Sequence, residues 1–258
     1  MRPIMISIFG FDIKAYGLFI AIAFIVGMKL AAHFAKEDGG DPEIVYDLTL
    51  YILVSALIGA RLLEVLVNYK DYFAHPGEIF KIWNGGLTFY GGLIAVIIVS
   101  YIYVKKKKID FYSYADYMAP SMAFGYMFGR IGCFFAGCCY GEPAAAGDLC
   151  VTFNHPMSFA PRGVCLYPTQ AYGALSALII GIILLIVRKR RAFKGQLFLL
   201  FFMLYAPARF MIEFIRDDAR GLYFNNSLST SQIIGIPFFF GTLVLYYILN
   251  KKSRNSST

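Results

Sequence analysis

Arg130 lies within a run of apolar and small residues, Phe124 to Gly141, that is long enough to enter a bilayer. A charged side chain at the bilayer centre costs roughly 2.5–3.5 kcal/mol even on the permissive insertion scale, so a membrane arginine indicates a functional site. No residue of opposite charge is near Arg130 in the sequence. We therefore expect its partner to be a ligand phosphate or a group on another helix.

Two further arginines, Arg61 and Arg209, are predicted at the same depth. Each of the three lies roughly six or seven residues before the outer end of its apolar run, which places it about 10 Å below the outer surface. Guanidinium groups stay charged and bind phosphate with two hydrogen bonds. One layer of three arginines predicts a single anion site in the outer leaflet.

Carboxylates near these arginines could hold them in place. Four residues share one face of the sixth apolar run, at spacings of four, four and three: Tyr205, Arg209, Glu213 and Arg216. Glu213 can therefore pair with Arg209, and Glu64 with Arg61. The alternative, that the Arg61–Glu64 pair only stabilises the helix, stays open.

Glycines accompany the arginines. Gly85-Gly86 and Gly91-Gly92 flank the start of the third apolar run, where paired glycines favour a bent backbone whose amides can bind an anion. Gly132 is next but one to Arg130, where a small residue permits close helix packing and leaves room for a lipid headgroup.

The composition predicts the elements that must position these side chains. The 258 residues are 59% hydrophobic and 16% charged, whereas soluble domains are about 45–50% apolar and about 25% charged. We expect an all-α polytopic membrane protein with a single domain, residues 1–258. Seven segments are long enough to span a bilayer: residues 13–34, 46–68, 87–104, 114–137, 168–187, 195–215 and 232–250.

Basic clusters predict the orientation. Residues 105–108, 188–191 and 251–252 follow the third, fifth and seventh segments, all on one side. The positive-inside rule makes that side cytoplasmic, so the N-terminus is outside and the C-terminus is cytoplasmic. The net charge of +8 thus reflects topology signals, and no nucleic-acid partner is expected. The longer loops, 69–86 and 138–167, face outward.

The five cysteines are an odd number, so at least one thiol is free within a single chain. They are Cys133, Cys138, Cys139, Cys150 and Cys165. Their spacing does not match the usual paired zinc-ligand patterns, so we expect no metal. A disulfide among the outward-facing cysteines fits an oxidising compartment, but the sequence leaves its pairing open.

Four ordered motifs resemble the prolipoprotein diacylglyceryl transferase family. They are GGLTFYGGL at residues 85–93, GRIGCF at 129–134 with Gly141, YPTQ at 167–170, and YAPARFMIEFIR at 205–216. The order and spacing hold from Tyr16 to the last apolar run. The resemblance implies a bacterial inner-membrane enzyme that moves the diacylglyceryl group of phosphatidylglycerol onto the lipobox cysteine thiol of prolipoproteins. It implies glycerol phosphate as the second product, and no cofactor.

The resemblance also implies the roles of residues. Arg130 matches the family's signature arginine, which binds the phosphate of phosphatidylglycerol, and Arg209 matches a second essential arginine. The expected catalytic residues are Arg130, Arg209, Tyr90 and Glu213. The expected phosphatidylglycerol-binding residues are Arg130, Arg209, Tyr16, Arg61, Gly91, Gly92, Gly132 and Tyr205.

The chain departs from the family pattern at three positions. Tyr90 stands where many members carry a histidine considered as a base, and tyrosine, with an ordinary pKa near 10, is a poor base at neutral pH. Cys133 and Cys138 stand where asparagine and glutamate are common. These changes keep open a divergent paralogue that uses the same lipid donor with a different acceptor.

A non-enzymatic lipid or anion transporter is the other alternative. Membrane arginines would suit it, but transporters commonly show inverted repeats, and no such repeat is visible in the sequence. A purely structural membrane protein would leave the charges unexplained.

Overall fold

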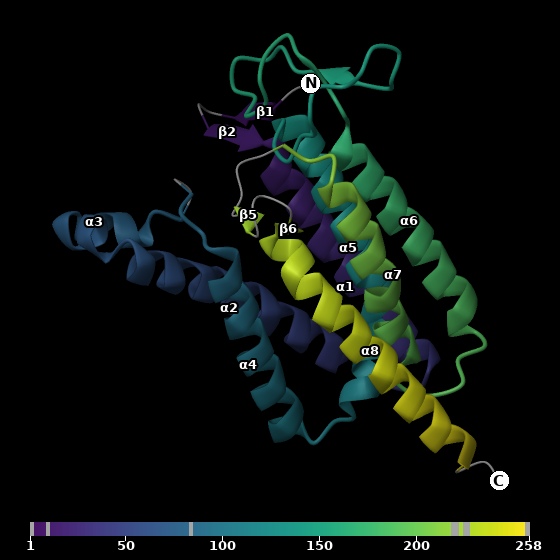
Figure 1. Cartoon of the computed structure of the whole chain (residues 1–258). Coiled ribbons are helices and arrows are strands. Elements are labelled where there is room, and N and C mark those ends of the chain that lie inside the picture. Colours follow the sequence, from purple (N-terminus) through teal and green to yellow (C-terminus); the bar gives the residue numbers. More distant parts are fainter. Residues whose placement is uncertain (1–2, 9–10, 83–84, 218–221, 224–227, 256–258) are drawn as a thin grey trace. The chain divides into compact units, whose positions relative to one another are not determined.

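The computed structural model describes residues 3–8, 11–82, 85–217, 222–223 and 228–255, and within them most residues are helical (Figure 1). The helices are α1 (Ala15–Glu37), α2 (Pro42–Val67), α3 (Tyr69–Ala74), the 3-10 helix η1 (Pro76–Phe80), α4 (Phe89–Lys107), α5 (Phe111–Ala136), α6 (Thr169–Arg188), α7 (Gln196–Glu213) and α8 (Thr230–Asn255). Three antiparallel strand pairs accompany them: β1 (Ile4–Ile8) with β2 (Phe11–Lys14), β3 (Val151–Thr152) with β4 (Cys165–Leu166), and β5 (Leu222–Tyr223) with β6 (Leu228–Ser229).

Each of the seven predicted spans is occupied by a long helix, so the predicted all-α polytopic fold is confirmed. Among the described helices, six are long and apolar enough to cross a membrane: α1, α2, α4, α6, α7 and α8. The seventh, α5, contains 26 residues and carries Arg130. Its tyrosines, glycines and arginine lower its mean hydropathy, which is why it falls outside this group.

The chain folds as two compact units. The first unit comprises Met1–Ala31 and Ala115–Thr258, and the second comprises Ala32–Tyr114. The expectation of a single functional domain over residues 1–258 stays a prediction.

In the second unit, α2 packs against α4 (Figure 1). Glycines allow the close approach, because a Cβ added at Gly59 would lie 2.5 Å from the carbonyl oxygen of Gly91. Gly92 adds to the contact, since a Cβ there would lie 3.0 Å from the carbonyl oxygen of Ala56. Any larger side chain at these positions would separate the helices.

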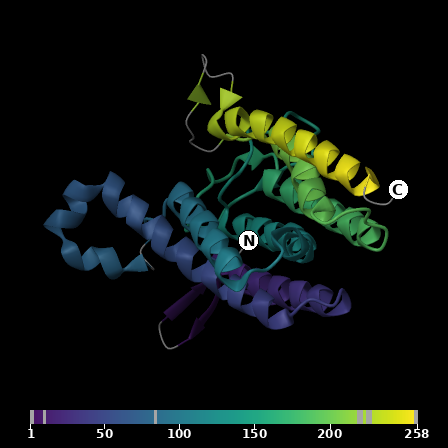
Figure 2. The same ribbon diagram turned by 90° about the horizontal axis from the view of Figure 1, so that it is seen from below.

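In the first unit, α6 and α8 both pack against α7. Both views show α8 running alongside α7 (Figures 1 and 2). A buried apolar cluster joins α5, α6 and α7: Ala119, Ala123, Ile180, Leu184, Leu197 and Phe201. The buried carboxylate of Asp116 accepts hydrogen bonds from the backbone amides of Gly195 at 2.8 Å and Phe198 at 3.0 Å. These amides at the start of α7 would otherwise lack partners. The helices α5, α6 and α7 are therefore packed together and joined at the start of α7. This packing fixes the positions of side chains at the other ends of these helices.

The loop between α5 and α6 has its own small core and a disulfide. Phe153, Ala160 and Leu166 are buried together. Cys150 and Cys165 are disulfide-bonded with their Cα atoms 5.3 Å apart, which confirms the expected disulfide and settles its pairing. The loop is also joined to the segment after α7, because the amide of Glu142 donates to the carbonyl oxygen of Ile215 at 3.0 Å.

Candidate active site

Arg130, on α5, has a guanidinium group that the protein only partly uses. Its Nε donates to the hydroxyl of Tyr126 at 2.8 Å, and its Cζ lies 4.8 Å from the centre of the same ring. Its stem passes over α6 at Gly173, where an added Cβ would lie 3.2 Å from Arg130 Cδ. Among the described residues, no hydrogen bond or ion pair reaches its two terminal nitrogens. These nitrogens are the pair that suits bidentate binding of a phosphate.

Tyr126 connects Arg130 to α7. The rings of Tyr126 and Tyr205 meet edge to face with centres 5.1 Å apart, and Tyr205 stacks on Phe201 at 5.6 Å. Sequence reasoning identified Tyr205 and missed Tyr126. Since Tyr126 precedes Arg130 by four residues on one helix, helical spacing alone could have identified it.

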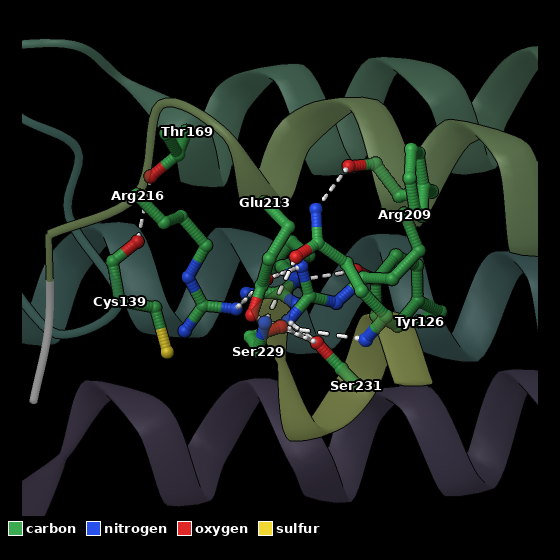
Figure 3. Close-up of polar contacts among 11 residues, drawn as sticks. Tyr126, Cys139, Thr169, Arg209, Glu213, Arg216, Ser229 and Ser231 are labelled. Carbon is green, nitrogen blue, oxygen red and sulfur yellow. Dashed lines mark hydrogen bonds and ion pairs between the residues drawn. The ribbon is translucent and has the colours of Figure 1, made fainter. Parts of the chain in front are cut away.

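The second arginine of the first unit, Arg209, is ion-paired with Glu213, as predicted (Figure 3). Its other terminal nitrogen lies 3.5 Å from the hydroxyl of Ser231, which itself donates to Glu213 Oε1 at 2.8 Å. Arg216 approaches the same carboxylate, with Nη1 4.0 Å from Glu213 Oε2. The Glu213 side chain is only 4% exposed. One buried carboxylate therefore faces two arginines.

Arg130 and the Arg209 group belong to one neighbourhood. Both Arg130 and Arg209 interact electrostatically with Tyr205, the ring between them. Tyr16, half exposed at the start of α1, interacts electrostatically with Arg130 as well. Gly132 permits this approach, because an added Cβ would lie 3.3 Å from Tyr16 Cα.

The turn after α5 is anchored by the start of α6. The hydroxyl of Thr169 donates to the carbonyl oxygen of Cys139 at 2.7 Å (Figure 3), and Nε2 of Gln170 donates to that of Cys138 at 2.8 Å. Both donor side chains are buried. Just beyond the turn, a Cβ at Gly141 would lie 2.7 Å from the carbonyl oxygen of Ile215, so this close passage needs glycine.

Tyr167, at the start of the YPTQ segment, has a different role. Its hydroxyl donates to Asp148 Oδ2 at 2.6 Å, and this hydrogen bond raises the pKa of Tyr167 above its ordinary value. The pair ties the end of the loop to its middle. The Tyr167 hydroxyl therefore stays protonated at neutral pH and acts as a hydrogen-bond donor.

In the second unit, Arg61 is buried and its donors are occupied by a loop. Nε donates to the carbonyl oxygen of Ile79 at 2.9 Å. Nη1 donates to the carbonyl oxygens of Gly85 at 2.9 Å and Gly86 at 2.7 Å and to the Tyr72 hydroxyl at 3.0 Å. Nη2 donates to the carbonyl oxygen of Glu78. The two glycines thus present carbonyl groups to an arginine, whereas the sequence had suggested amides for an anion.

Glu64 does not pair with Arg61 in the described structure. Its carboxylate accepts hydrogen bonds from the Thr88 hydroxyl at 2.5 Å and from Asn68 Nδ2 at 2.8 Å. A cavity of about 330 Å³ opens beside Arg61, and its lining includes three acidic residues: Glu64, Asp71 and Glu78. Carboxylates around an opening disfavour an anionic ligand.

The ten predicted site residues divide between the two units. Six belong to the first: Tyr16, Arg130, Gly132, Tyr205, Arg209 and Glu213. Four belong to the second: Arg61, Tyr90, Gly91 and Gly92. Tyr90 is 43% exposed at the start of α4, while Gly91 and Gly92 are buried. Their roles toward a substrate stay predictions.

Comparison with known proteins decides the family. The family model described as prolipoprotein diacylglyceryl transferase matches residues 3–248. The chain belongs to this family. It is 34% identical to the phosphatidylglycerol–prolipoprotein diacylglyceryl transferase of Clostridium tetani over 92% of this chain and 93% of that protein. It is 33% identical to the enzyme of the same name from Finegoldia magna over 95% and 94%, and 31% identical to the transferase numbered 2 of Clostridium perfringens over 100% and 99%.

The family match confirms the resemblance inferred from the four motifs, and the geometry gives three of them a physical function. GRIGCF carries Arg130 and the glycine that admits Tyr16. YPTQ supplies the buried donors that hold the turn after α5. YAPARFMIEFIR carries the Arg209–Glu213 pair and the ring that supports Tyr126.

Proposed function

We propose that this protein transfers the diacylglyceryl group of phosphatidylglycerol to the lipobox cysteine thiol of prolipoproteins and releases glycerol phosphate. One observation carries the proposal. In a helical membrane protein of this family, Arg130 presents two guanidinium nitrogens that no described residue occupies. Arg130 and a second arginine, Arg209, both interact electrostatically with Tyr205. This arrangement suits the phosphodiester of a phospholipid.

The charges around Arg130 favour a phosphate over a neutral headgroup. Arg209 and Arg216 both contact the carboxylate of Glu213, so cationic groups accompany Arg130 in this part of the first unit. Such charges act strongly where water is largely excluded. The hydrogen bond that Arg130 Nε donates to the Tyr126 hydroxyl fixes the guanidinium, so its terminal nitrogens are oriented before a ligand arrives.

The chemistry is a displacement at the glycerol carbon that carries the phosphodiester. The sulfur of the acceptor cysteine forms a bond to this carbon, and the bond from carbon to the phosphate oxygen breaks. Negative charge grows on the leaving phosphate, where Arg130 and Arg209 stabilise it. Glu213, held by Arg209 and Ser231, keeps Arg209 in position.

Three of the four predicted residues of the second unit are assigned supporting roles. Arg61 holds the loop that contains η1, because backbone carbonyls and Tyr72 take up its donors. Gly91 and Gly92 allow α2 and α4 to approach. A role of Tyr90 toward the substrate stays a prediction, and as a tyrosine it is a poor base at neutral pH.

We place the protein in the bacterial cytoplasmic membrane as a multi-pass enzyme whose site faces the outer leaflet. The basic clusters support this orientation. The Cys150–Cys165 disulfide supports it independently, because the loop that carries it would then lie in an oxidising compartment.

The test is a transfer assay in membranes with labelled phosphatidylglycerol and a lipobox peptide. The wild-type protein should label the peptide and release glycerol phosphate, and it should restore growth of a strain depleted of its own transferase. Arg130→Ala should do neither, although it is inserted at wild-type levels. Consumption of phosphatidylglycerol without labelling of the lipobox cysteine would favour the paralogue with another acceptor, which the Cys133 and Cys138 positions motivate.

A further inference from the structure

Three free thiols meet beside Arg130. The Sγ atoms of Cys133, Cys138 and Cys139 all lie within 4.8 Å of one another. Cys133 is buried on α5, and the other two are half-buried in the turn that follows. We call these three residues the thiol cluster. The thiol cluster is therefore partly accessible.

The backbone holds the thiol cluster in place. Thr169 and Gln170, both buried, bind the carbonyl oxygens of Cys139 and Cys138. Cys139 has φ +60°, a left-handed conformation that few residues other than glycine adopt. Such conformations persist where the surroundings impose them, and they concentrate at functional sites. The turn brings two cysteines back toward Cys133.

The separation of the sulfurs suits a zinc ion. With Zn–S bonds of about 2.3 Å, tetrahedral geometry places thiolate sulfurs about 3.8 Å apart. A contraction of about 1 Å or less from 4.8 Å lies within the reach of small side-chain rotations. The group of donors found among the described residues holds these three and no fourth. Three protein ligands with an open fourth position are typical of catalytic zinc, whereas structural zinc has four.

Charges nearby offset those of a metal-bound cluster. Arg130 and Arg216 both interact electrostatically with Cys139, and Figure 3 shows the Cys139 sulfur and the Arg216 guanidinium on the same side of the turn. Three thiolates with one Zn²⁺ carry a net charge of −1. A neighbouring arginine stabilises that charge at short range.

We propose that the thiol cluster binds Zn²⁺ and that the acceptor cysteine thiol of the substrate becomes the fourth ligand. This inference rests on the proposed function and adds how the acceptor is activated. The sequence predicted no metal because Cys133, Cys138 and Cys139 do not form paired zinc-ligand spacings. The left-handed turn after α5 brings the three sulfurs together, although the spacing of these cysteines in the sequence does not indicate it.

The step balances as follows. The acceptor thiol replaces a water on zinc and loses its proton to solvent, since a coordinating thiol is deprotonated outright. The thiolate electron pair forms the new carbon–sulfur bond, and the electrons of the broken carbon–oxygen bond pass to the leaving phosphate. The neutral thioether then leaves the zinc and water returns. This step needs no protein base. It agrees with the presence of a tyrosine, Tyr90, at the sequence position where many family members carry a histidine.

The first measurement is metal binding by the full-length protein in detergent, after reduction and metal removal. Co²⁺ serves as the spectroscopic probe, because thiolate ligands give it charge-transfer absorption. The wild type should show this absorption, and Zn²⁺ should abolish it. Cys138→Ser and Cys133→Ser should each lose most of it. The matched control, Cys150→Ser with Cys165→Ser, removes two other cysteines of the same loop and should keep it.

The second measurement adds a lipobox peptide to the Co²⁺-loaded protein. Binding of the peptide thiol should shift the absorption, and a peptide with serine in place of the cysteine should not. Chelation of zinc should lower transfer by about 100-fold, the size expected for lost proton-transfer catalysis, and Zn²⁺ should restore it.

The outcomes separate this inference from the proposed function. Absence of thiolate absorption in the wild type, an equal spectrum in Cys138→Ser, or a native disulfide within the thiol cluster would each overturn the metal site. Undiminished transfer after chelation would overturn its role while leaving the transferase intact. Arg130→Ala should lower transfer by about 10²–10³-fold and still show thiolate absorption at saturating Co²⁺, because Arg130 is not a metal ligand, although it should bind Co²⁺ more weakly. If the Co²⁺ spectrum responds to the peptide thiol but the wild-type protein transfers no lipid, the metal site stands and the proposed function fails.

Discussion

Arg130 and Arg61 look alike in the sequence and differ in the structure. Both are arginines in long apolar helices, predicted at one depth. Arg61 donates to four backbone carbonyl oxygens and one hydroxyl, so each of its three side-chain nitrogens has a protein partner. Arg130 donates once, through Nε, among the described residues. A membrane arginine can therefore have its donors taken up by protein groups, as at Arg61, or keep most of them available, as at Arg130. Only the second arrangement leaves donors for a ligand.

Arg209 lies between these extremes. It is paired with Glu213 and close to Ser231, but the same carboxylate also serves Arg216. Its positive charge is thus shared and only partly neutralised. The three arginines can be ranked by how many of their N–H donors bind no described protein group. Substitutions can test that ranking.

The largest effect is expected at Arg130. Arg130→Ala should lower transfer by about 10²–10³-fold, the loss typical of removing one donor that stabilises developing negative charge. The loss of stability should be limited to the hydrogen bond and ring contact with Tyr126, because the terminal nitrogens have no protein partner among the described residues. Transfer rates and thermal unfolding in detergent measure both. Arg130→Lys is the control, which keeps the charge and loses bidentate geometry; full activity in it would contradict phosphate binding by the guanidinium fork.

Arg61→Ala should give the reverse pattern. It leaves buried carbonyl oxygens without donors, at a cost of about 1–3 kcal/mol for each group that water cannot reach. The unfolding temperature and the protease resistance of the loop with α3 and η1 should fall together. Transfer per folded molecule should fall less than in Arg130→Ala. A stable but inactive Arg61→Ala protein would instead place this arginine at the substrate.

Tyr126→Phe separates orientation from charge. The ring remains against Tyr205, while the hydrogen bond to Arg130 Nε is lost. A hydrogen bond to a charged group contributes about 1.5–3 kcal/mol, so we expect about a tenfold or greater loss of transfer. The loss should appear in kcat more than in KM if Tyr126 aims the guanidinium at the transition state. An unchanged rate would mean that the cation–ring contact alone suffices.

The smallest effect is expected for Ser231→Ala. Ser231 donates to Glu213 and lies near Arg209, yet the ion pair persists without it. Loss of one ordinary hydrogen bond, about 0.5–1.5 kcal/mol, predicts about a threefold decrease in transfer. Glu213→Gln in the same assay should cost more. If Ser231→Ala proves as severe as Arg130→Ala, Ser231 contacts the substrate directly.

The features predicted from the sequence are those that repeat with helical periodicity. Long apolar runs predicted the seven long helices, and spacings of four predicted the Arg209–Glu213 pair. The same spacing would have indicated Tyr126. These contacts lie within one helix, so linear distance translates directly into space.

The features that sequence reasoning missed depend on backbone atoms and on other segments. The partners of Arg61 are mostly carbonyl groups, which every residue possesses and no residue type reveals. Ser231 reaches Glu213 from α8. The turn that forms the thiol cluster uses two left-handed residues, Gly137 and Cys139. The glycine after α5 could have indicated the end of the helix, but nothing in the sequence marks Cys139.

The junction between Gly141 and Arg216 has a consequence for biogenesis. The two residues form a β-bridge, so the turn after α5 and the segment after α7 complete one another. During synthesis, α5 with Arg130 emerges long before that second segment exists. The enzyme should therefore remain inactive until its sixth long helix has inserted, and chains truncated before Arg216 should be recognised by membrane proteases as unfinished.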